Sequence, residues 1–360
     1  MRSLLRRAAA RLLVLAVAVS GLCLATVATS APASAATMVR ECKVTGNGCV
    51  SFSGYAGRST WGYPVSSRGT NCVNYVAYRL ARNGVARQSA MGNGGSWAAS
   101  ARKRGFRVDR TPKVGSIAQW NYGSAYAPSY GHVGYVEEVT SSYLVISDNS
   151  YGGGYSSRWR VPKGDRNWPS NFIHFKDTAY QPPKAGSFLK VRETGRLYRL
   201  VGTKTPLRVA STTNLGTIHP YLVASTTLAT LPASVPDGTF LQAGIRKDIY
   251  RVTGGAPLPV RSWAAVGGTK PYLRVDQQAI DLAGTGGDWN RLRRVARDGQ
   301  VLMVLSSGRR YVVQAGKALA FTDWSQVGGQ RAAAPVDPAA LAYAGRPPQY
   351  VHLTGVGVLP

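Results

Sequence analysis

The chain has 360 residues, with 44 lysines and arginines against 16 aspartates and glutamates, so its formal net charge is +28. Hydrophobic residues make up 44% of the sequence, which excludes a disordered polycation and predicts about two globular domains. The excess of positive charge favours anionic partners, which include nucleic acid, an anionic membrane face and an acidic wall polymer.

The first 36 residues have the layout of a secretory signal peptide. Basic residues open the segment, an apolar run follows over 12–27, and small residues fill 31–36. The apolar run is short for a membrane span, and no later stretch is long enough to be one. We therefore expect a secreted protein, free or associated with the cell wall, with no integral membrane segment after signal removal and no nucleic-acid partner.

The cysteine count points to one unpaired thiol. Cys23 leaves with the signal peptide, and Cys42 and Cys49 flank a turn-rich segment that favours a disulfide in an oxidising compartment. Cys72 is then left alone. Residues 37–57 are expected to form an N-terminal arm or a short pro-region that contains the disulfide loop.

A helix is predicted to begin near Cys72. Apolar residues recur at helical spacing, at Val73, Val76, Ala77 and Leu80. Thr70 or Asn71 can cap its start, and Asn83-Gly84 can end it. Cys72 therefore lies in the first turn, where unpaired N–H groups and the helix dipole stabilise a thiolate.

Two strands follow and supply a candidate base and a candidate orienting residue. His132 lies in a predicted strand over 131–139, and a second strand over 143–147 leads into Asp148. In a Cys-His-Asp arrangement, His132 would accept the thiol proton and Asp148 would orient the imidazole. A single histidine on a strand is more often structural, but three compatible residues in this order favour catalysis.

No other catalytic or cofactor motif is present. The sequence contains no nucleophile-elbow serine, no phosphate-binding loop and no zinc-protease helix motif. The cysteines and histidines lack metal-ligand spacing, and no calcium loop occurs. We therefore predict neither a metal nor a cofactor.

Five segments together resemble the CHAP family, the cysteine- and histidine-dependent amidohydrolases/peptidases of bacterial cell-wall turnover. The resemblance covers about residues 58–177, and we place the domain at 58–178. The segments are GTNCVNY (69–75), GNGGSW (92–97), VDRTPKVGSIAQW (108–120), GHVGYVE (131–137) and FIHF (172–175).

This resemblance implies a papain-like α+β fold, in which the helix with Cys72 packs on an antiparallel sheet that carries His132. It implies hydrolysis of amide bonds in peptidoglycan, by an N-acetylmuramoyl-L-alanine amidase or by a peptide-bridge endopeptidase. Where the family usually shows Glu, this sequence has Asp148. A one-residue slip would place Asn149 in the position of a neighbouring family asparagine, so Asn149 is the second candidate for the third residue.

The remaining candidate residues could stabilise the oxyanion or line the substrate cleft. The backbone N–H of Cys72 and the Asn71 side chain could stabilise the tetrahedral oxyanion. Trp97, Trp120 and Tyr151 are candidate cleft walls, although Trp120 suits the core better. His174 near the end of the domain is expected to be structural.

Residues 179–185 are predicted to be a linker, and residues 186–360 a β-rich domain of three repeats. The repeats align on Tyr198, Tyr250 and Tyr311, and Trp263 recurs as Trp324. Units of this kind stack to share a core, here either as a closed trefoil-like body or as a row. Their basic residues could bind anionic wall polymers, or the repeats could be a spacer.

Two functions therefore remain open. The first is a secreted, monomeric peptidoglycan hydrolase whose partners are peptidoglycan and anionic wall polymers. The second is a non-catalytic surface protein that binds the wall through a degenerate CHAP module. The presence of both Cys72 and His132 favours the enzyme.

Overall fold

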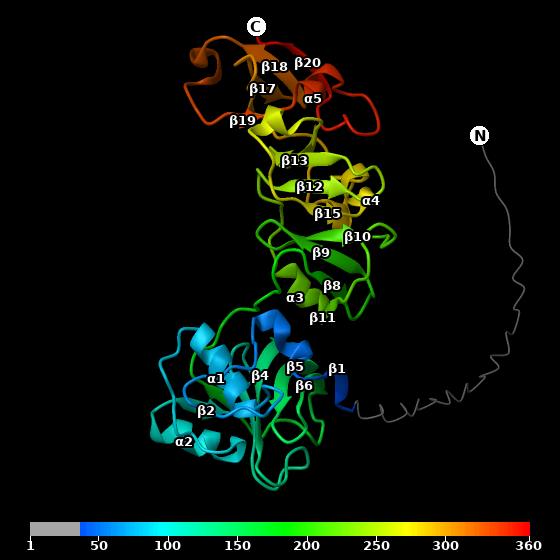
Figure 1. Cartoon of the computed structure of the whole chain (residues 1–360). Helices are drawn as coiled ribbons and strands as arrows, with labels where there is room; N and C mark the ends of the chain where they lie inside the picture. The colour runs from blue at the N-terminus through cyan, green and yellow to red at the C-terminus, as the bar shows by residue number, and fades with distance from the viewer. Residues whose placement is uncertain (1–36) are drawn as a thin grey trace, which may run out of the picture. The chain divides into compact units, whose positions relative to one another are not determined.

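The structure is a computed structural model that describes residues 37–360. The predicted signal peptide, including Cys23, lies outside the described residues. Most of the regular structure consists of β-strands, and the helices are short (Figure 1). No helix within 37–360 combines the length and the apolar character needed to cross a membrane.

The N-terminal half is built on one seven-stranded antiparallel sheet in the order β1-β6-β5-β4-β3-β7-β2. Its strands are β1 (Val39–Thr45), β2 (Arg107–Asp109), β3 (Ile117–Trp120), β4 (His132–Val139), β5 (Tyr143–Ser150), β6 (Tyr155–Pro162) and β7 (Asn171–His174). Its helical segments are η1 (Gly48–Ser53), α1 (Cys72–Arg82), η2 (Gly94–Ser96) and α2 (Trp97–Lys103).

Residues 39–45 of the predicted N-terminal arm form a strand of this sheet. β1 pairs with β6 from Val39 to Thr45, with an irregularity between Arg40 and Cys42. The Cys42–Cys49 disulfide joins β1 to η1. The predicted arm therefore contains an edge strand of this sheet.

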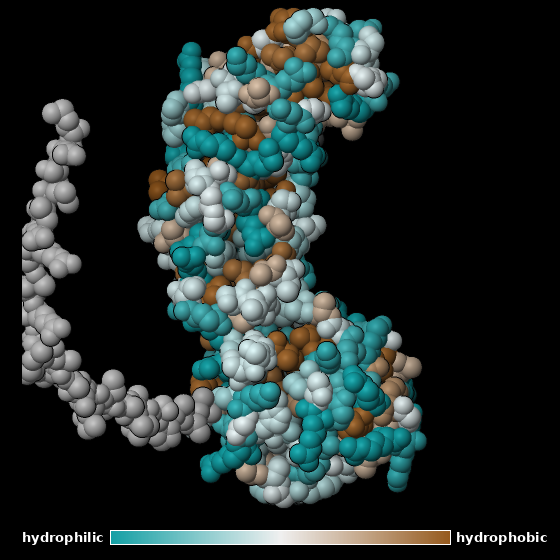
Figure 2. Space-filling view, turned by 180° about the vertical axis from the view of Figure 1, so that it is seen from behind, coloured by the Kyte–Doolittle hydropathy of each residue, from teal (hydrophilic) through white to brown (hydrophobic). Residues whose placement is uncertain are grey.

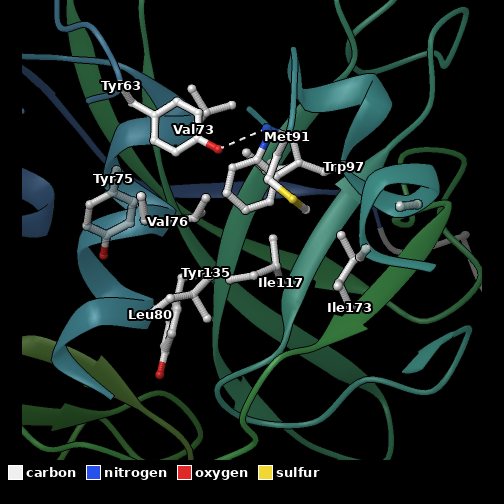
Figure 3. Packing of buried hydrophobic residues seen from close by; sticks show 14 of the residues in the cluster. Tyr63, Val73, Tyr75, Val76, Leu80, Met91, Trp97, Ile117, Tyr135 and Ile173 are labelled. Carbon is white, nitrogen blue, oxygen red and sulfur yellow. Dashed lines mark hydrogen bonds between the residues drawn. The ribbon is translucent and has the colours of Figure 1, made fainter. Parts of the chain in front are cut away.

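Helix α1 lies against β4 and β5 and buries the stripe predicted from the sequence (Figure 3). Val76, Ala77 and Leu80 are fully buried, and they pack with Tyr75 and Tyr135 in one apolar cluster. Burying a side chain such as Leu80 contributes about 1.5–3 kcal/mol. This packing fixes the position of the N-terminal end of α1, where Cys72 lies.

Each C-terminal repeat has three antiparallel strands, then a short strand that returns parallel to the first, then a short helix. The first contains β8 (Phe188–Val191), β9 (Leu197–Val201), β10 (Thr205–Val209), β11 (Tyr221–Val223) and α3 (Ser225–Ala229). The second contains β12 (Phe240–Ala243), β13 (Ile249–Thr253), β14 (Ala256–Val260), η3 (Trp263–Val266), β15 (Leu273–Val275), α4 (Gln277–Asp281) and η4 (Gly287–Trp289). The third contains β16 (Val301–Met303), β17 (Arg310–Gln314), β18 (Lys317–Phe321), η5 (Trp324–Val327), β19 (Ala334–Pro335), α5 (Pro338–Ala342) and β20 (Gly355–Val358).

The repeats form a row of three separate sheets, and the trefoil-like alternative was wrong for the described residues. Consecutive repeats share their cores, because Val201 and Leu207 pack with the second repeat, and Ala256 and Leu258 pack with the third. On the face shown in Figure 2, hydrophilic side chains surround separate groups of hydrophobic ones.

An aspartate joins each later repeat to the one before it. Asp276 caps α4 and also accepts the backbone N–H groups of Ala210 and Ser211 at 2.6 and 2.9 Å. Asp337 caps α5 and accepts those of Arg261 and Ser262, both at 2.8 Å. The same position in the first repeat is Ala224, whose own N–H donates to Glu138 of β4 at 2.9 Å.

The first repeat is also held to the N-terminal sheet by ion pairs. Arg192 pairs with Glu41 of β1 and with Glu138 of β4. The Arg192 and Arg158 guanidinium groups both donate to the carbonyl oxygen of Leu222, each at 2.9 Å. The first repeat is thus docked on the sheet that carries His132.

Candidate active site

Cys72 is the first residue of α1 and takes part in no disulfide. It is half-buried and packs at the edge of the apolar cluster beneath α1. Its neighbour Asn71 is the N-cap, with its side-chain oxygen accepting the N–H of Val73 at 3.0 Å. The helix start is thereby fixed, and it favours negative charge on the sulfur.

His132 is the first residue of β4 and is paired with Trp120 on β3. Its Nε2 lies 2.9 Å from Oδ2 of Asp148, near the end of β5. The register pairs Tyr135 with Ser147, so Asp148 lies opposite Gly134 and diagonal to His132. A Cβ at Gly134 would lie 3.6 Å from that of Asp148, so the two positions face each other on the same side of the sheet.

The surroundings of His132 favour its charged form. Burial alone would lower the pKa of His132, but the charge of Cys72, hydrogen bonds with Asp148 and Cys72 and the charge of Asp148 raise it from 6.5 to about 10. Since Asp148 engages Nε2, Nδ1 is the ring nitrogen left for Cys72. Asp148 is thus bonded to the imidazole, and Cys72 is close enough to raise the pKa of His132.

Tyr126 also belongs to the site, and the sequence analysis missed it. Its hydroxyl donates to Oδ2 of Asp148 at 2.9 Å, and its ring lies edge-on to His132 with centroids 5.5 Å apart. Burial, followed by the charge and hydrogen bond of Asp148, raises the pKa of Tyr126 well above its usual value. Tyr126 lies in the loop between β3 and β4, where no periodicity marks a residue.

Two glycines let another loop approach the start of β4. A side chain at Gly94 would place its Cβ 2.7 Å from the Cα of His132, and one at Gly131 would lie 2.3 Å from the Cα of Gly95. The N–H of Gly95 donates to the carbonyl of Tyr130 at 2.9 Å. The glycine segment noted in the sequence therefore supports the backbone that carries His132.

Two of the predicted aromatic residues are buried. Trp97 is fully buried, with its Nε1 donating to Gly92, so it fills the core and the prediction of a cleft wall was wrong. Trp120 is also buried, and its ring centroid lies 5.7 Å from that of His132. It packs behind the imidazole, whereas Tyr151 is 54% exposed in the turn after β5.

The two predicted asparagines have other partners. Asn71 donates its side-chain N–H to the carbonyl of Pro64 at 2.8 Å while capping α1, so it is a helix cap and not a free oxyanion donor. Asn149 donates to Asn47 at 3.2 Å and makes no hydrogen bond with His132. Of the two candidates for the third residue, the structure brings only Asp148 to the imidazole.

The other histidine of this half has a structural environment, as expected. His174 on β7 hydrogen-bonds Asp177 through Nδ1 and Asp109 through Nε2, at 2.8 and 3.0 Å. These contacts tie β7 to β2. Within 37–360, no three His, Cys, Asp or Glu side chains are grouped as metal ligands.

Comparisons with known proteins found one matching family, several relatives and two similar solved structures. The model of the CHAP domain matches residues 58–149. The probable autolysin LDP of Staphylococcus aureus (strain NCTC 8325 / PS 47) is 40% identical over 84 residues, which are 23% of this chain and 28% of that protein. Staphylococcal secretory antigen SsaA of the same strain is 38% identical over 105 residues, which are 29% of this chain and 38% of that protein.

A solved structure described as an N-acetylmuramoyl-L-alanine amidase from Staphylococcus aureus is 28% identical, covers 30% of each chain and has a TM-score of 0.28. The chain thus matches well under half of the length of each of these relatives. The match includes the segments of Cys72, His132 and Asp148. Residues 58–149 therefore match the CHAP domain.

Proposed function

We propose that this protein is a secreted peptidoglycan hydrolase that cleaves an amide bond, with Cys72 as the nucleophile, His132 as acid and base, and Asp148 as the orienting residue. The observation that carries the proposal is the joint placement of a free cysteine at a helix start and an imidazole bonded to a buried carboxylate. The autolysin among the relatives and the papain-like arrangement of helix and sheet support it.

The reaction follows from these three groups. The Cys72 thiolate attacks the carbonyl carbon and forms a C–S bond, while the oxyanion is stabilised by donors that include the backbone N–H of Cys72. His132 gives its proton to the amide nitrogen, and the C–N bond breaks. Water, deprotonated by His132, then attacks the thioester and releases the thiolate.

The geometry is equally suited to an amidase and to a peptide-bridge endopeptidase, since both cleave amides with the same groups. The bond is identified by incubating the mature protein with purified sacculi and determining new amino termini by mass spectrometry. An amidase frees the amino group of the first residue of the stem peptide and leaves a carboxyl group on the glycan. An endopeptidase frees an amino group within the peptide.

Cys72→Ser and His132→Ala should each abolish release of these fragments, because they remove the nucleophile and the base. His219→Ala is the matched control, since His219 is exposed in the first repeat. Equal release by the wild type and Cys72→Ser would contradict the proposal and favour the non-catalytic wall-binding protein.

A further inference from the structure

A cavity of about 790 Å³ lies where the C-terminal end of α1, the linker and the first repeat meet. Its lining holds five basic residues and no acidic one: Arg79, Arg82, Lys176, Lys184 and Lys204. Arg79 is neutralised by a buried ion pair with Glu137. The other four form no ion pair within residues 37–360, so their charges are uncompensated there.

The residue that directly precedes the third strand of each repeat is a lysine in the first repeat and a glycine in the other two. Lys204 directly precedes β10 and has a left-handed φ of 74°. The residues that directly precede β14 and β18 are Gly255 and Gly316, with φ of 78° and 76°. Because a left-handed backbone disfavours any residue with a Cβ, the lysine costs some folding free energy, as Ala315 does in the third turn. Only the first of the three turns lines the cavity.

The position of the lysine side chain agrees with a binding role. Its Nζ donates to the carbonyl of Pro182 at 3.0 Å, which holds the ammonium group beside the linker. The lining also contains hydroxyl and amide side chains, among them Thr178, Gln181 and Thr203. Such a lining can bind phosphate oxygens through cations and neighbouring hydroxyl groups through neutral polar atoms.

We infer that this cavity binds a phosphodiester-linked polyol, an anionic polymer with a negative charge and free hydroxyl groups in each unit. The inference goes beyond the proposed reaction. It rests on that reaction only in expecting that the natural ligand is a polymer of the cell wall. Cys72 and Arg82 lie at opposite ends of α1, about 15 Å apart at 1.5 Å per residue. A polymer bound here would leave the nucleophile free.

Binding is measured by titration calorimetry of the full mature chain, as Cys72→Ser, with a synthetic poly(glycerol phosphate). Lys204→Gly is the most informative variant, because it installs the residue found in the other two turns. We expect unchanged or increased stability to urea and at least a threefold weaker Kd. A purely structural lysine would give the stability gain without the loss of affinity.

A triple variant of Arg82, Lys176 and Lys184 to Gln should weaken binding at least tenfold and flatten its dependence on salt. The matched control changes Lys103, Arg110 and Lys163 to Gln, which removes the same charge from exposed positions outside the cavity. Equal weakening by both triples, or wild-type affinity in Lys204→Gly, would overturn the inference.

Two further experiments test the choice of ligand and distinguish binding in the cavity from the proposed reaction. Poly-glutamate and neutral dextran test carboxylate and uncharged ligands, and binding of poly-glutamate as tight as that of the phosphate polymer would overturn the choice of phosphate. Sacculi stripped of phosphate polymers should be cleaved equally by active chains with and without the cavity triple. If neither chain cleaves them, the proposed function fails while calorimetry still decides the cavity.

Discussion

Tyr126 and His132 both hydrogen-bond the same oxygen of Asp148, each at 2.9 Å. The Asp148 side chain is 4% exposed, so these two bonds fix the direction of its carboxylate within the sheet. We therefore expect Tyr126 to position the imidazole by acting through Asp148.

Tyr126→Phe should lower kcat about tenfold with little change in KM, since the loss of one hydrogen bond to a charged group is worth about 1.5 kcal/mol. The matched control is Tyr122→Phe, which removes another hydroxyl from the same loop, one bonded to Ser96 at 2.7 Å. Equal effects of the two variants in steady-state hydrolysis would exclude the positioning role.

Asp148→Asn should lower activity at neutral pH by about 10–100-fold, because the imidazole loses its charged partner. Asp148 raises the pKa of His132, so the variant should also lose activity at a lower pH on the alkaline limb of its kcat/KM profile. Asn149→Ser should retain activity within about twofold. The opposite ranking would make Asn149 the orienting residue.

The charge of His132 also predicts how stability depends on pH. Its pKa is raised from 6.5 to about 10 on folding, so the stabilisation is fully present below pH 6.5 and is lost as pH rises towards 10. The unfolding free energy of the wild type should therefore fall relative to His132→Gln by about 1–3 kcal/mol between pH 6.5 and 10. Urea titrations at three pH values measure the difference, and a constant gap would contradict it.

Asp337→Ala should loosen the third repeat from the second. Three backbone N–H groups, of Arg261, Ser262 and Ala339, would lose their acceptor, at a cost of about 2–4 kcal/mol. Asp298→Ala is a suitable control because Asp298 is exposed. Urea unfolding should separate the two variants, and similar midpoints would show that the carboxylate does not join the repeats.

The sequence and pairing of the edge strands predict the effect of one truncation. β10 and β14 contain Pro206, Pro257 and Pro259, which lack an N–H for pairing, whereas β18 has no proline and its edge is paired with β20. Deleting residues 355–360 should expose β18 and promote self-association. Ala318→Pro in the truncated chain, at the position of Pro206 and Pro257, should suppress it. Sedimentation velocity measures both, and a monodisperse truncated chain would contradict the prediction.

Local patterns in the sequence predicted the residues that we propose as the centre of the site. The helical spacing around Leu80 and the strand around His132 are short-range signals, and the order of the motifs brought Cys72 and Asp148 into the hypothesis. Tyr126 was not predictable in this way, because it reaches Asp148 from an irregular loop. Asn71 and Trp97 were misread because capping and core packing decide what those side chains contact.

Prediction of the repeats from local sequence patterns has the same limit. Their tyrosines and glycine turns are visible in the sequence, but β11, β15 and β19 have only two or three residues and no period that could reveal them. The row arrangement depends on Asp276 and Asp337, whose partners lie about 65 to 76 residues earlier in the chain. Contacts of that range leave no mark on local composition.

In each of the first two repeats, two backbone N–H groups donate to an aspartate of the next repeat. In the third repeat, the equivalent N–H groups bond within the repeat itself. Its backbone N–H groups at Thr322 and Asp323 both donate to the side chain of Gln326, at 3.1 Å, where the second repeat has Ala265 and leaves the equivalent groups to Asp337. A duplicate of the second repeat could consequently be spliced in ahead of the third. A copy appended after the third repeat would find these two N–H groups already bonded to Gln326, and the edge of β18 already paired with β20.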